Sequence, residues 1–256
     1  MSLDPITLSV LRSALAGIAE EMGTVLVRSA YSSNIKERRD CSAALFDADA
    51  RMVAQAEHIP VHLGAMPESV EAVRARGAAP GETWILNDPY TGGTHLPDVT
   101  LVTPVGIDGR VVAYAVTRAH HSDVGGMSPG SMPATSRDLW QEGLVIPPVR
   151  FTDEVMELVC ANSRTPRLRR GDFRAQAAAN RVGGQRVVEL AARMGLEIVT
   201  AGMAEVLDYA ERRAREALRA LPDGVYRAAT ELEGDGVTDA DIPIRVAVTI
   251  DGDRAV

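Results

Sequence analysis

The stretch NDPYTGGTHLPD, residues 87–98, constrains the fold more than any other part of this sequence. Its two prolines have no backbone N–H to donate, and the adjacent Gly92 and Gly93 favour turns, so it can continue neither a helix nor a strand. The stretch must therefore be a bent loop. Because that loop carries His95 and Asp98, it is either a simple turn or a place where polar side chains converge for chemistry.

Length and charge narrow the class of protein. The chain has 256 residues, 46% of them hydrophobic, which is enough for one large domain or two modest ones. A formal net charge of −8 argues against a broad contact with nucleic acid or an anionic membrane. The two cysteines form no CxxC pair, and there is neither a signal-peptide pattern nor an apolar run long enough to span a membrane. We therefore expect a cytoplasmic protein.

The hydrophobic patterning predicts an α+β fold with mixed or antiparallel sheets, a long N-terminal helix and a helical second half. Asp4 is expected to cap a helix over the first 30 residues. The segment AMPESVEAVRARG predicts a short helix that starts after Pro67 and ends at Gly77. Residues 171–221 carry two helical patterns separated by Gly195. We expect no firm internal boundary, with at most a soft division near 150–165.

Strand patterning surrounds the bent loop and returns at the end of the chain. The expected strands and hairpins are CSAALFDADARMVAQ, ETWILN, VTLVTPVGIDGRVVAYAVTRAHH with a turn at Asp108–Gly109, GVYRAATELEG and IPIRVAVTIDGDRAV. The last DGD turn predicts a returning strand. We therefore expect the chain to be a fragment, or to be completed by another polypeptide.

All five histidines fall between positions 58 and 121, and they stand at the ends of expected elements. His95 and Asp98 have HxxD spacing on the bent loop, and His120 or His121 ends the neighbouring strand. Two imidazoles and one carboxylate hold a divalent metal and leave positions open for water or substrate. Asp123 is then either a fourth ligand or a hydrogen-bond partner of a histidine. The alternative is a set of ordinary surface or hydrogen-bonded histidines.

Other chemistries find less support in the sequence. There is no GxxxxGK[ST] loop for nucleotide phosphates and no GxSxG serine elbow. The run RTPRLRRGDFR holds five arginines within eleven residues. Guanidinium groups bind phosphate or carboxylate groups, so this run predicts either an anion site, a contact with a partner, or simply a solvated start of a helix.

Four motifs, in order along the chain, resemble the hydantoinase B/oxoprolinase family. They are NDPYTGGTHLPDVTLVTPV, AHHSDVGGMSPGS, EGLVIPPV and RGDFRAQAAANRVGGQRVVEL. That family includes the B-type subunits of ATP-dependent N-methylhydantoinases and 5-oxoprolinases, and of acetone and acetophenone carboxylases. The resemblance covers the N-terminal half of such a protein.

The resemblance implies roles for particular residues. It implies that His95, Asp98 and His120 are the metal ligands, with manganese, zinc or iron as the metal. His120 is preferred because it stands first in the family's H-x-x-D-[VIT]-G-G pattern, and His121 is the fallback.

The resemblance also implies supporting residues around those ligands. Asn87 and Asp88 would shape the loop that carries the ligands. Asp40, in ERRDCSAA, would face the same cleft, and Asp123 belongs to the same motif as the histidine pair. We therefore expect Asp40, Asn87, Asp88 and Asp123 to be the catalytic residues around the metal.

A division of labour follows from the resemblance. A hydantoinase A-type partner would bind ATP and phosphorylate a carbonyl oxygen of a small-molecule substrate, and this chain would carry the metal. The outcome would be hydrolysis of a cyclic amide of the hydantoin or 5-oxoproline type, or carboxylation of a ketone. A further chain could supply the C-terminal half. Two rival interpretations are a non-catalytic, half-length assembly subunit and a stand-alone metal-dependent amidohydrolase.

Overall fold

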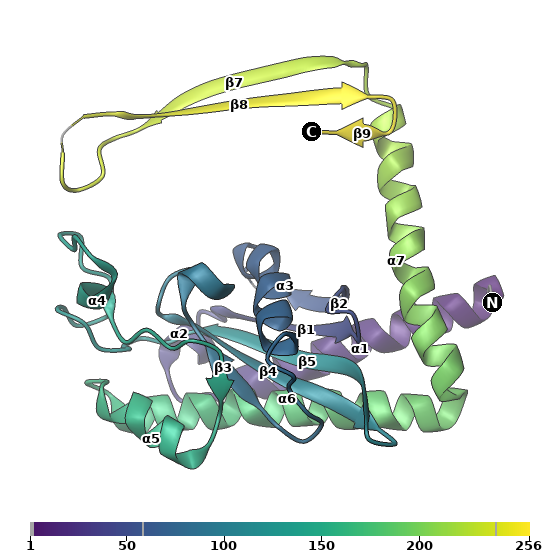
Figure 1. The fold of residues 1–256 in the computed structure, drawn as a ribbon, viewed down its shortest axis with the longest axis horizontal. Coiled ribbons are helices and arrows are strands. Elements are labelled where there is room, and N and C mark those ends of the chain that lie inside the picture. The colour runs from purple at the N-terminus through teal and green to yellow at the C-terminus, as the bar shows by residue number, and fades with distance from the viewer. Residues whose placement is uncertain (1–2, 58, 239) are drawn as a thin grey trace.

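The computed structural model describes residues 3–57, 59–238 and 240–256. Its centre is a six-stranded sheet with the order β2-β1-β5-β4-β3-β6, in which every neighbouring pair is antiparallel (Figure 1). The strands are β1 (Cys41–Asp47), β2 (Met52–Glu57), β3 (Trp84–Leu86), β4 (Asp98–Ile107), β5 (Arg110–His120) and β6 (Val149–Arg150). The predicted α+β class with antiparallel sheets is confirmed.

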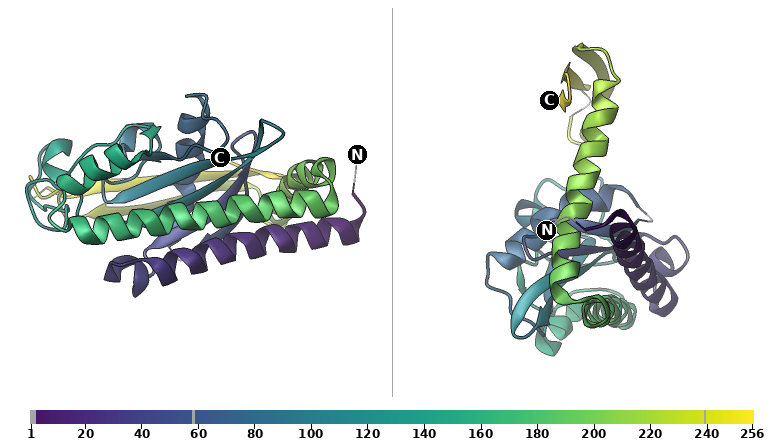
Figure 2. Two further views of the ribbon diagram at one scale, coloured as in Figure 1. Left: turned by 90° about the horizontal axis from the view of Figure 1, so that it is seen from below. Right: turned by 90° about the vertical axis from the view of Figure 1, so that its right-hand side faces the viewer.

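One face of this sheet packs on long helices. Two of them, α1 (Pro5–Ser29) and α6 (Pro166–Met194), lie side by side along the sheet (Figure 2). Asp4 caps α1 as predicted, since its side chain accepts hydrogen bonds from the backbone N–H groups of Ile6 and Thr7. The core here is formed by Leu11, Leu15, Met22 and Leu26 of α1, Ala179, Val187 and Leu190 of α6, and Ala43, Leu45, Ala113 and Ala115 of the sheet.

The other face packs on α3 (Val61–Arg74), with η1 (Pro89–Thr91) beside it. The prediction that this helix starts after Pro67 was wrong, because it starts at Val61 and keeps Pro67 inside it. Burial of Leu63, Met66, Val70 and Val73 against the sheet explains why the helix continues through a residue that lacks a backbone donor. Tertiary packing outweighs the local preference here.

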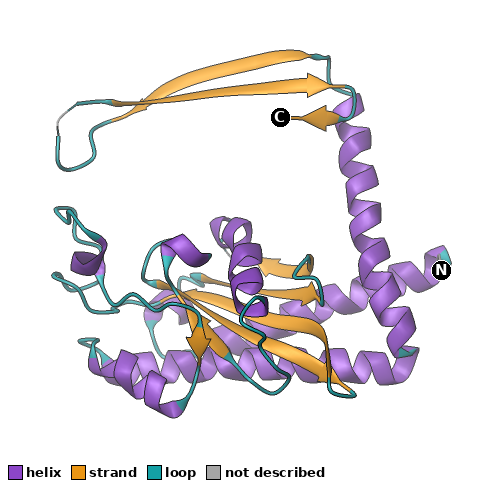
Figure 3. Ribbon diagram, viewed as in Figure 1, coloured by secondary structure: helices purple, strands orange, loops and turns teal. Residues whose placement is uncertain are grey.

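Three shorter helices lie near the end of the large sheet that carries the bent loop. They are α2 (Ser33–Lys36), α4 (Leu139–Glu142) and α5 (Asp153–Ala161), joined by long irregular segments drawn as loops in Figure 3. The β4–β5 hairpin turns at Asp108–Gly109 as predicted, with φ values of 50° and 75°. No helix among the described residues has both the length and the apolar character to cross a membrane.

A second sheet stands apart from the first at the end of α7 (Leu196–Arg219) (Figures 1 and 2). It has the order β7-β8-β9, formed by β7 (Gly224–Leu232), β8 (Ile242–Asp251) and β9 (Arg254–Ala255), so the returning strand predicted from the DGD turn is present. The register places Tyr226 opposite Val248 and Leu232 opposite Ile242. One face of the hairpin is therefore apolar, and these side chains are exposed.

Candidate metal centre

The predicted trio of His95, Asp98 and His120 comes together at one end of the large sheet. Asp98 is the first residue of β4 and pairs with His120, the last residue of β5. Directly opposed residues in an antiparallel pair point to the same face, so both side chains lie on the α3 face. His95 reaches them from the bent loop just before β4.

The donor atoms of the trio have the spacing of a metal site. His95 Nε2 lies 3.0 Å from His120 Nδ1, Asp98 Oδ1 lies 3.2 Å from His120 Nδ1, and Asp98 Oδ1 lies 3.6 Å from His95 Nε2. Ligand bonds of about 2.0–2.1 Å in a tetrahedral arrangement place neighbouring donors about 3.3 Å apart. The three atoms therefore fit around a single divalent ion. Among the described residues, this is the one group of three ligating side chains close enough to do so.

The electrostatics of the trio suit a cation. Burial by itself raises the pKa of Asp98, but hydrogen bonds with His120 and His62 outweigh it, so its pKa lies well below the ordinary value. The pKa of His95 is lowered, mainly because the ring is partly desolvated. The site thus presents a carboxylate and a neutral imidazole. The His95 side chain is 45% exposed and that of Asp98 only 3%, so the site opens on the His95 side.

His62 is a member of this cluster that the sequence patterns did not reveal. It lies on the first turn of α3 and is almost fully buried. Its Nε2 is 3.6 Å from a carboxylate oxygen of Asp40 and 3.6 Å from one of Asp98, and its Nδ1 is 3.2 Å from Ser42 Oγ. His62 therefore bridges the two carboxylates, and it brings the predicted Asp40 to the edge of the trio. The fifth histidine, His58, lies outside the described residues.

Asn87 holds the bent loop at its base. Its fully buried side chain donates to the carbonyl oxygens of Leu96 (2.8 Å) and Leu144 (2.9 Å), and its Oδ1 accepts from Ile146 N–H (2.6 Å). Asp88 caps η1 by accepting from the backbone N–H of Tyr90. Both residues thus bond to backbone groups of the loop, and a role in shaping it stays a prediction. Neither makes a hydrogen bond to the trio within the described part of the chain.

Arg118, on β5, bonds to the middle of the bent loop at Gly92. It is fully buried two residues before His120 on the same face, and it donates to Thr100 Oγ1, to Ser69 Oγ and to the carbonyl oxygen of Gly92, each at 2.8 Å. Burial lowers its pKa to about 10. Gly92 has φ +94°, and a Cβ there would stand 2.4 Å from the backbone nitrogen of Ser69. The loop can approach α3 this closely only with glycine at that position.

Asp123 organises the glycine-rich loop after β5. Its carboxylate accepts from the backbone N–H groups of Gly125, Gly130 and Arg164, and it pairs with the Arg164 guanidinium at 3.1 Å. Burial raises the pKa of Asp123, but these donors outweigh burial and lower it. The carboxylate therefore bonds to backbone and arginine here, and no hydrogen bond joins it to a described histidine.

His121 faces the opposite side of the sheet from His120. Its Nε2 lies 2.8 Å from Gln176 Oε1 of α6, and its ring stacks on Phe173 with 4.4 Å between ring centroids. Complete burial lowers its pKa to about 3. Consecutive strand residues point to opposite faces, so the two adjacent histidines cannot both reach the loop. The geometry therefore places His120, and not His121, beside His95 and Asp98.

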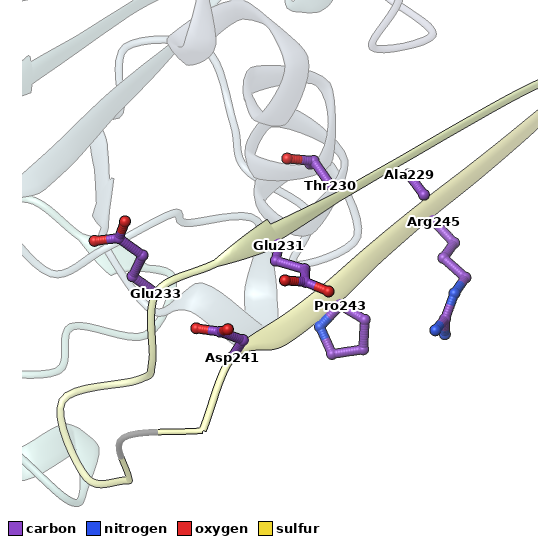
Figure 4. A pocket seen from close by; sticks show the side chains of 7 residues that line it. All are labelled: Ala229, Thr230, Glu231, Glu233, Asp241, Pro243 and Arg245. Atoms are coloured by element: carbon purple, nitrogen blue, oxygen red, sulfur yellow. The ribbon is translucent and has the colours of Figure 1, made fainter.

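One hollow of the described surface lies elsewhere, on the second sheet. It has a volume of about 560 Å³ and is lined only by residues of the β7–β8 hairpin, among them Glu231, Glu233 and Asp241 (Figure 4). These side chains lie on an exposed hairpin, so they do not form a buried group of metal-binding atoms. The chemistry suggested by the sequence is therefore centred on the histidine cluster and not on this hollow.

Comparison with known proteins identifies the class to which this fold and site belong. The sequence matches the family described as Hydantoinase B/oxoprolinase over residues 4–256. The chain therefore belongs to the hydantoinase B/oxoprolinase family, as the four motifs indicated.

Individual relatives are consistent with this assignment. The putative B component of a D-/L-hydantoinase from a Pseudomonas species is 34% identical over 98% of this chain and 45% of its own length. The crystal structure of an ATP-dependent caprolactamase from Pseudomonas jessenii matches with a TM-score of 0.92 and 34% identity, over all of this chain and 46% of that one. An acetone carboxylase structure shares the fold, with a TM-score of 0.88 at 19% identity over 98% of this chain and 36% of that one. The chain spans less than half the length of the relatives it matches.

Proposed function

We propose that this chain carries the divalent-metal site of an ATP-dependent complex that hydrolyses a cyclic amide, with ATP used by a hydantoinase A-type partner. The observation that supports this most directly is the convergence of His95 Nε2, His120 Nδ1 and Asp98 Oδ1 within 4.8 Å of one another. Manganese, zinc and iron(II) all accept such a set of two imidazoles and one carboxylate.

The metal, when bound, would polarise a carbonyl oxygen or lower the pKa of a bound water. The protein's own residues set the rest of the chemistry. Both imidazoles must offer a lone pair to the ion, so each carries its proton on the other ring nitrogen. The exposed edge of His95 marks the side from which substrate enters. Asp40 supplies a second carboxylate beside His62, either as a further oxygen ligand or as the group that takes a proton from water.

Two observations support a separate ATP-binding partner: the sequence has no usual nucleotide-phosphate loop, and its relatives include an ATP-dependent enzyme and a subunit of a larger enzyme. The chain has no phosphate-binding loop of the GxxxxGK[ST] type, whereas the caprolactamase it resembles is ATP-dependent. The hydantoinase relative is one component of a multi-subunit enzyme. An A-type partner that phosphorylates the amide oxygen would make a stable ring susceptible to attack at this site.

A small cyclic amide of the hydantoin, 5-oxoproline or lactam type is the substrate we favour. The hydantoinase component and the caprolactamase, each 34% identical to this chain, are both named for ring amides. Carboxylation of a ketone has less support, because the likeness to acetone carboxylase rests on the fold alone. A cytoplasmic location remains a prediction.

The first experiment is metal analysis of the purified chain without a histidine tag. We expect close to one equivalent of manganese, zinc or iron in the parent, and its loss in His95→Ala and His120→Ala. His121→Ala is the matched control, because His121 lies on the opposite face. Asp40→Asn then separates two roles for Asp40, since a ligand's loss removes metal and a proton acceptor's loss does not.

The second experiment measures hydrolysis by the chain co-expressed with an A-type partner. We expect ring opening of hydantoin, 5-oxoproline or caprolactam that needs ATP, the partner and His120. If neither the chain nor the complex binds any of the three metals, the metal role is refuted and the interpretation as an assembly protein takes its place. Ring opening by the chain and metal without ATP would instead indicate a stand-alone amidohydrolase.

A further inference from the structure

A groove runs along the first turns of α6 where the end of α1 approaches it. Its volume is about 470 Å³. Its lining includes Ser29, Tyr31, Arg167, Arg170, Gly171 and Arg174. None of the proposed metal ligands contributes to it, so this groove is a feature separate from the histidine cluster.

Two contacts of Tyr31 hold one side of the groove against α6. Tyr31 donates its backbone N–H to the buried carboxylate of Asp172 at 2.7 Å, which ties the segment after α1 to α6. The Tyr31 ring lies directly over Gly171, where a Cβ would stand only 2.4 Å from the ring. Tyr31 as a whole is nevertheless 58% exposed. A fixed aromatic ring beside arginines is a composition typical of the best-binding part of protein interfaces.

The arginine run is only partly neutralised. Three of its five guanidinium groups have carboxylate partners: Arg164 pairs with Asp123 at 3.1 Å, Arg169 with Asp172 at 2.8 Å and Arg170 with Glu157 at 2.5 Å. Arg167 and Arg174 have no carboxylate oxygen within 4.0 Å in the part of the chain that the structure describes. Glu157 interacts electrostatically with Arg174, but it is bonded to Arg170.

Arg167 stands at an unfavourable place, in the first turn of α6. The first turn of α6 contains no acidic residue, and the N-terminal end of a helix carries partial positive charge that disfavours cations. An anionic group placed in the groove would relieve both the repulsion along the helix and the missing pairing.

The distance between Arg167 and Arg174 indicates whether the groove would bind a small anion or a longer acidic segment. Arg167 and Arg174 are seven residues apart, which corresponds to two helical turns or about 10 Å along α6. A segment in the polyproline II conformation covers that distance with three residues at about 3.1 Å each, and side chains three residues apart then point the same way. A single phosphate would engage only one end of the groove. We propose that this groove is a docking surface for an extended acidic segment of a partner protein, with carboxylates at Arg167 and Arg174 and an apolar side chain on Tyr31.

The test measures binding of a defined probe. A fluorescein-labelled peptide of about eight residues, with glutamate at every third position and alanine between, is titrated with the full chain and followed by anisotropy. We expect saturable binding that weakens about tenfold or more in the Arg167→Gln/Arg174→Gln double variant. Both side chains are exposed, so the variant should keep the parent's unfolding midpoint. A peptide with lysine in place of glutamate should not bind.

A matched control separates specific docking from simple charge. Arg186→Gln/Arg193→Gln removes two arginines with the same seven-residue spacing on the same helix, where Arg186 is already paired with Glu21 and Glu189. This control should bind the peptide like the parent. Equal weakening in both double variants would overturn the proposal, as would unchanged binding after loss of Arg167 and Arg174. Displacement of the peptide by millimolar inorganic phosphate would overturn it too, and would reassign the groove to a small anion. The metal content of the protein plays no part in any of these outcomes.

Discussion

Replacement of Asn87 by alanine tests whether the bent loop is held by its buried anchor. The change removes three hydrogen bonds, to Leu96, Leu144 and Ile146, and leaves two carbonyl oxygens and one N–H without their partner. A typical internal hydrogen bond contributes about 1 kcal/mol net, and a buried group left unpaired costs about 1–3 kcal/mol. For three such groups the expected loss is about 3–9 kcal/mol, a large part of the stability of a typical domain at about 5–15 kcal/mol.

Urea unfolding followed by circular dichroism measures this loss. Asn162→Ala is the control, because Asn162 is exposed and its side chain makes one hydrogen bond, to the carbonyl of Leu158, so its loss should cost less than about 1 kcal/mol. Asn87→Asp should be at least as harmful as alanine, since a carboxylate oxygen would face the two carbonyls. A loss below about 1 kcal/mol for Asn87→Ala would refute the idea that this side chain anchors the loop.

Three further predictions concern the same end of the sheet. His120→Ala should lose bound metal while His121→Ala keeps it, as elemental analysis would show, and the reverse result would contradict the assignment by strand face. Since the folded-state pKa of Asp123 is lowered, its contribution to stability is present above its unfolded pKa of about 3.8 and is lost as pH falls through the folded value. Asp123→Asn should therefore be less stable than the parent at pH 7, and the gap should shrink below about pH 4 in unfolding experiments. Gly92→Ala should lower the free energy of unfolding by about 3 kcal/mol or more, because φ is +94° and the new methyl group meets backbone of α3; a neutral result would mean that the loop can move away from α3.

The strand register explains how far the sequence could identify the ligands. The β4–β5 hairpin and its turn were predicted correctly, and that hairpin places Asp98 opposite His120. Residue spacing alone left His120 and His121 open. Strand alternation resolves them, because only one residue of an adjacent pair can share the face of Asp98. Counting residues outward from the Asp108–Gly109 turn would have paired Asp98 with Ala119 and favoured His121, because the register shifts by one residue between Val105 and Gly106.

His62 was missed because the start of its helix was placed too late. With the helix beginning after Pro67, residue 62 fell in an irregular segment. In the structure, His62, Met66 and Val73 lie along the buried side of α3. A histidine on an otherwise apolar stripe was the available signal, and it becomes visible only once Pro67 is allowed inside the helix. Local proline preference therefore concealed a residue that tertiary packing placed in the site.

The bonding partners of the loop's supports could not be predicted, because they come from distant parts of the chain. Asn87 bonds to residues 57 and 59 positions later, and Arg118 bonds to Ser69, 49 positions earlier. Nothing in the composition of the loop indicates these partners. Its glycines and prolines predict that the chain bends, but they do not determine where His95 points.

The bend and the site geometry thus have different causes. Turn residues make the loop possible, whereas two buried polar side chains from outside its turn hold its ends and its middle: Asn87 against the 144–146 segment, and Arg118 against Gly92. If local turn preference were sufficient, neutral substitutions at these anchors would leave the donor atoms of His95 and Asp98 in place. Because each anchor is fully buried and bonded to backbone, its loss should instead displace His95 relative to His120. Metal affinity in Asn87→Ala, measured under conditions where the variant remains folded, distinguishes these two causes: a folded variant with the parent's affinity would mean that the turn alone sets the geometry.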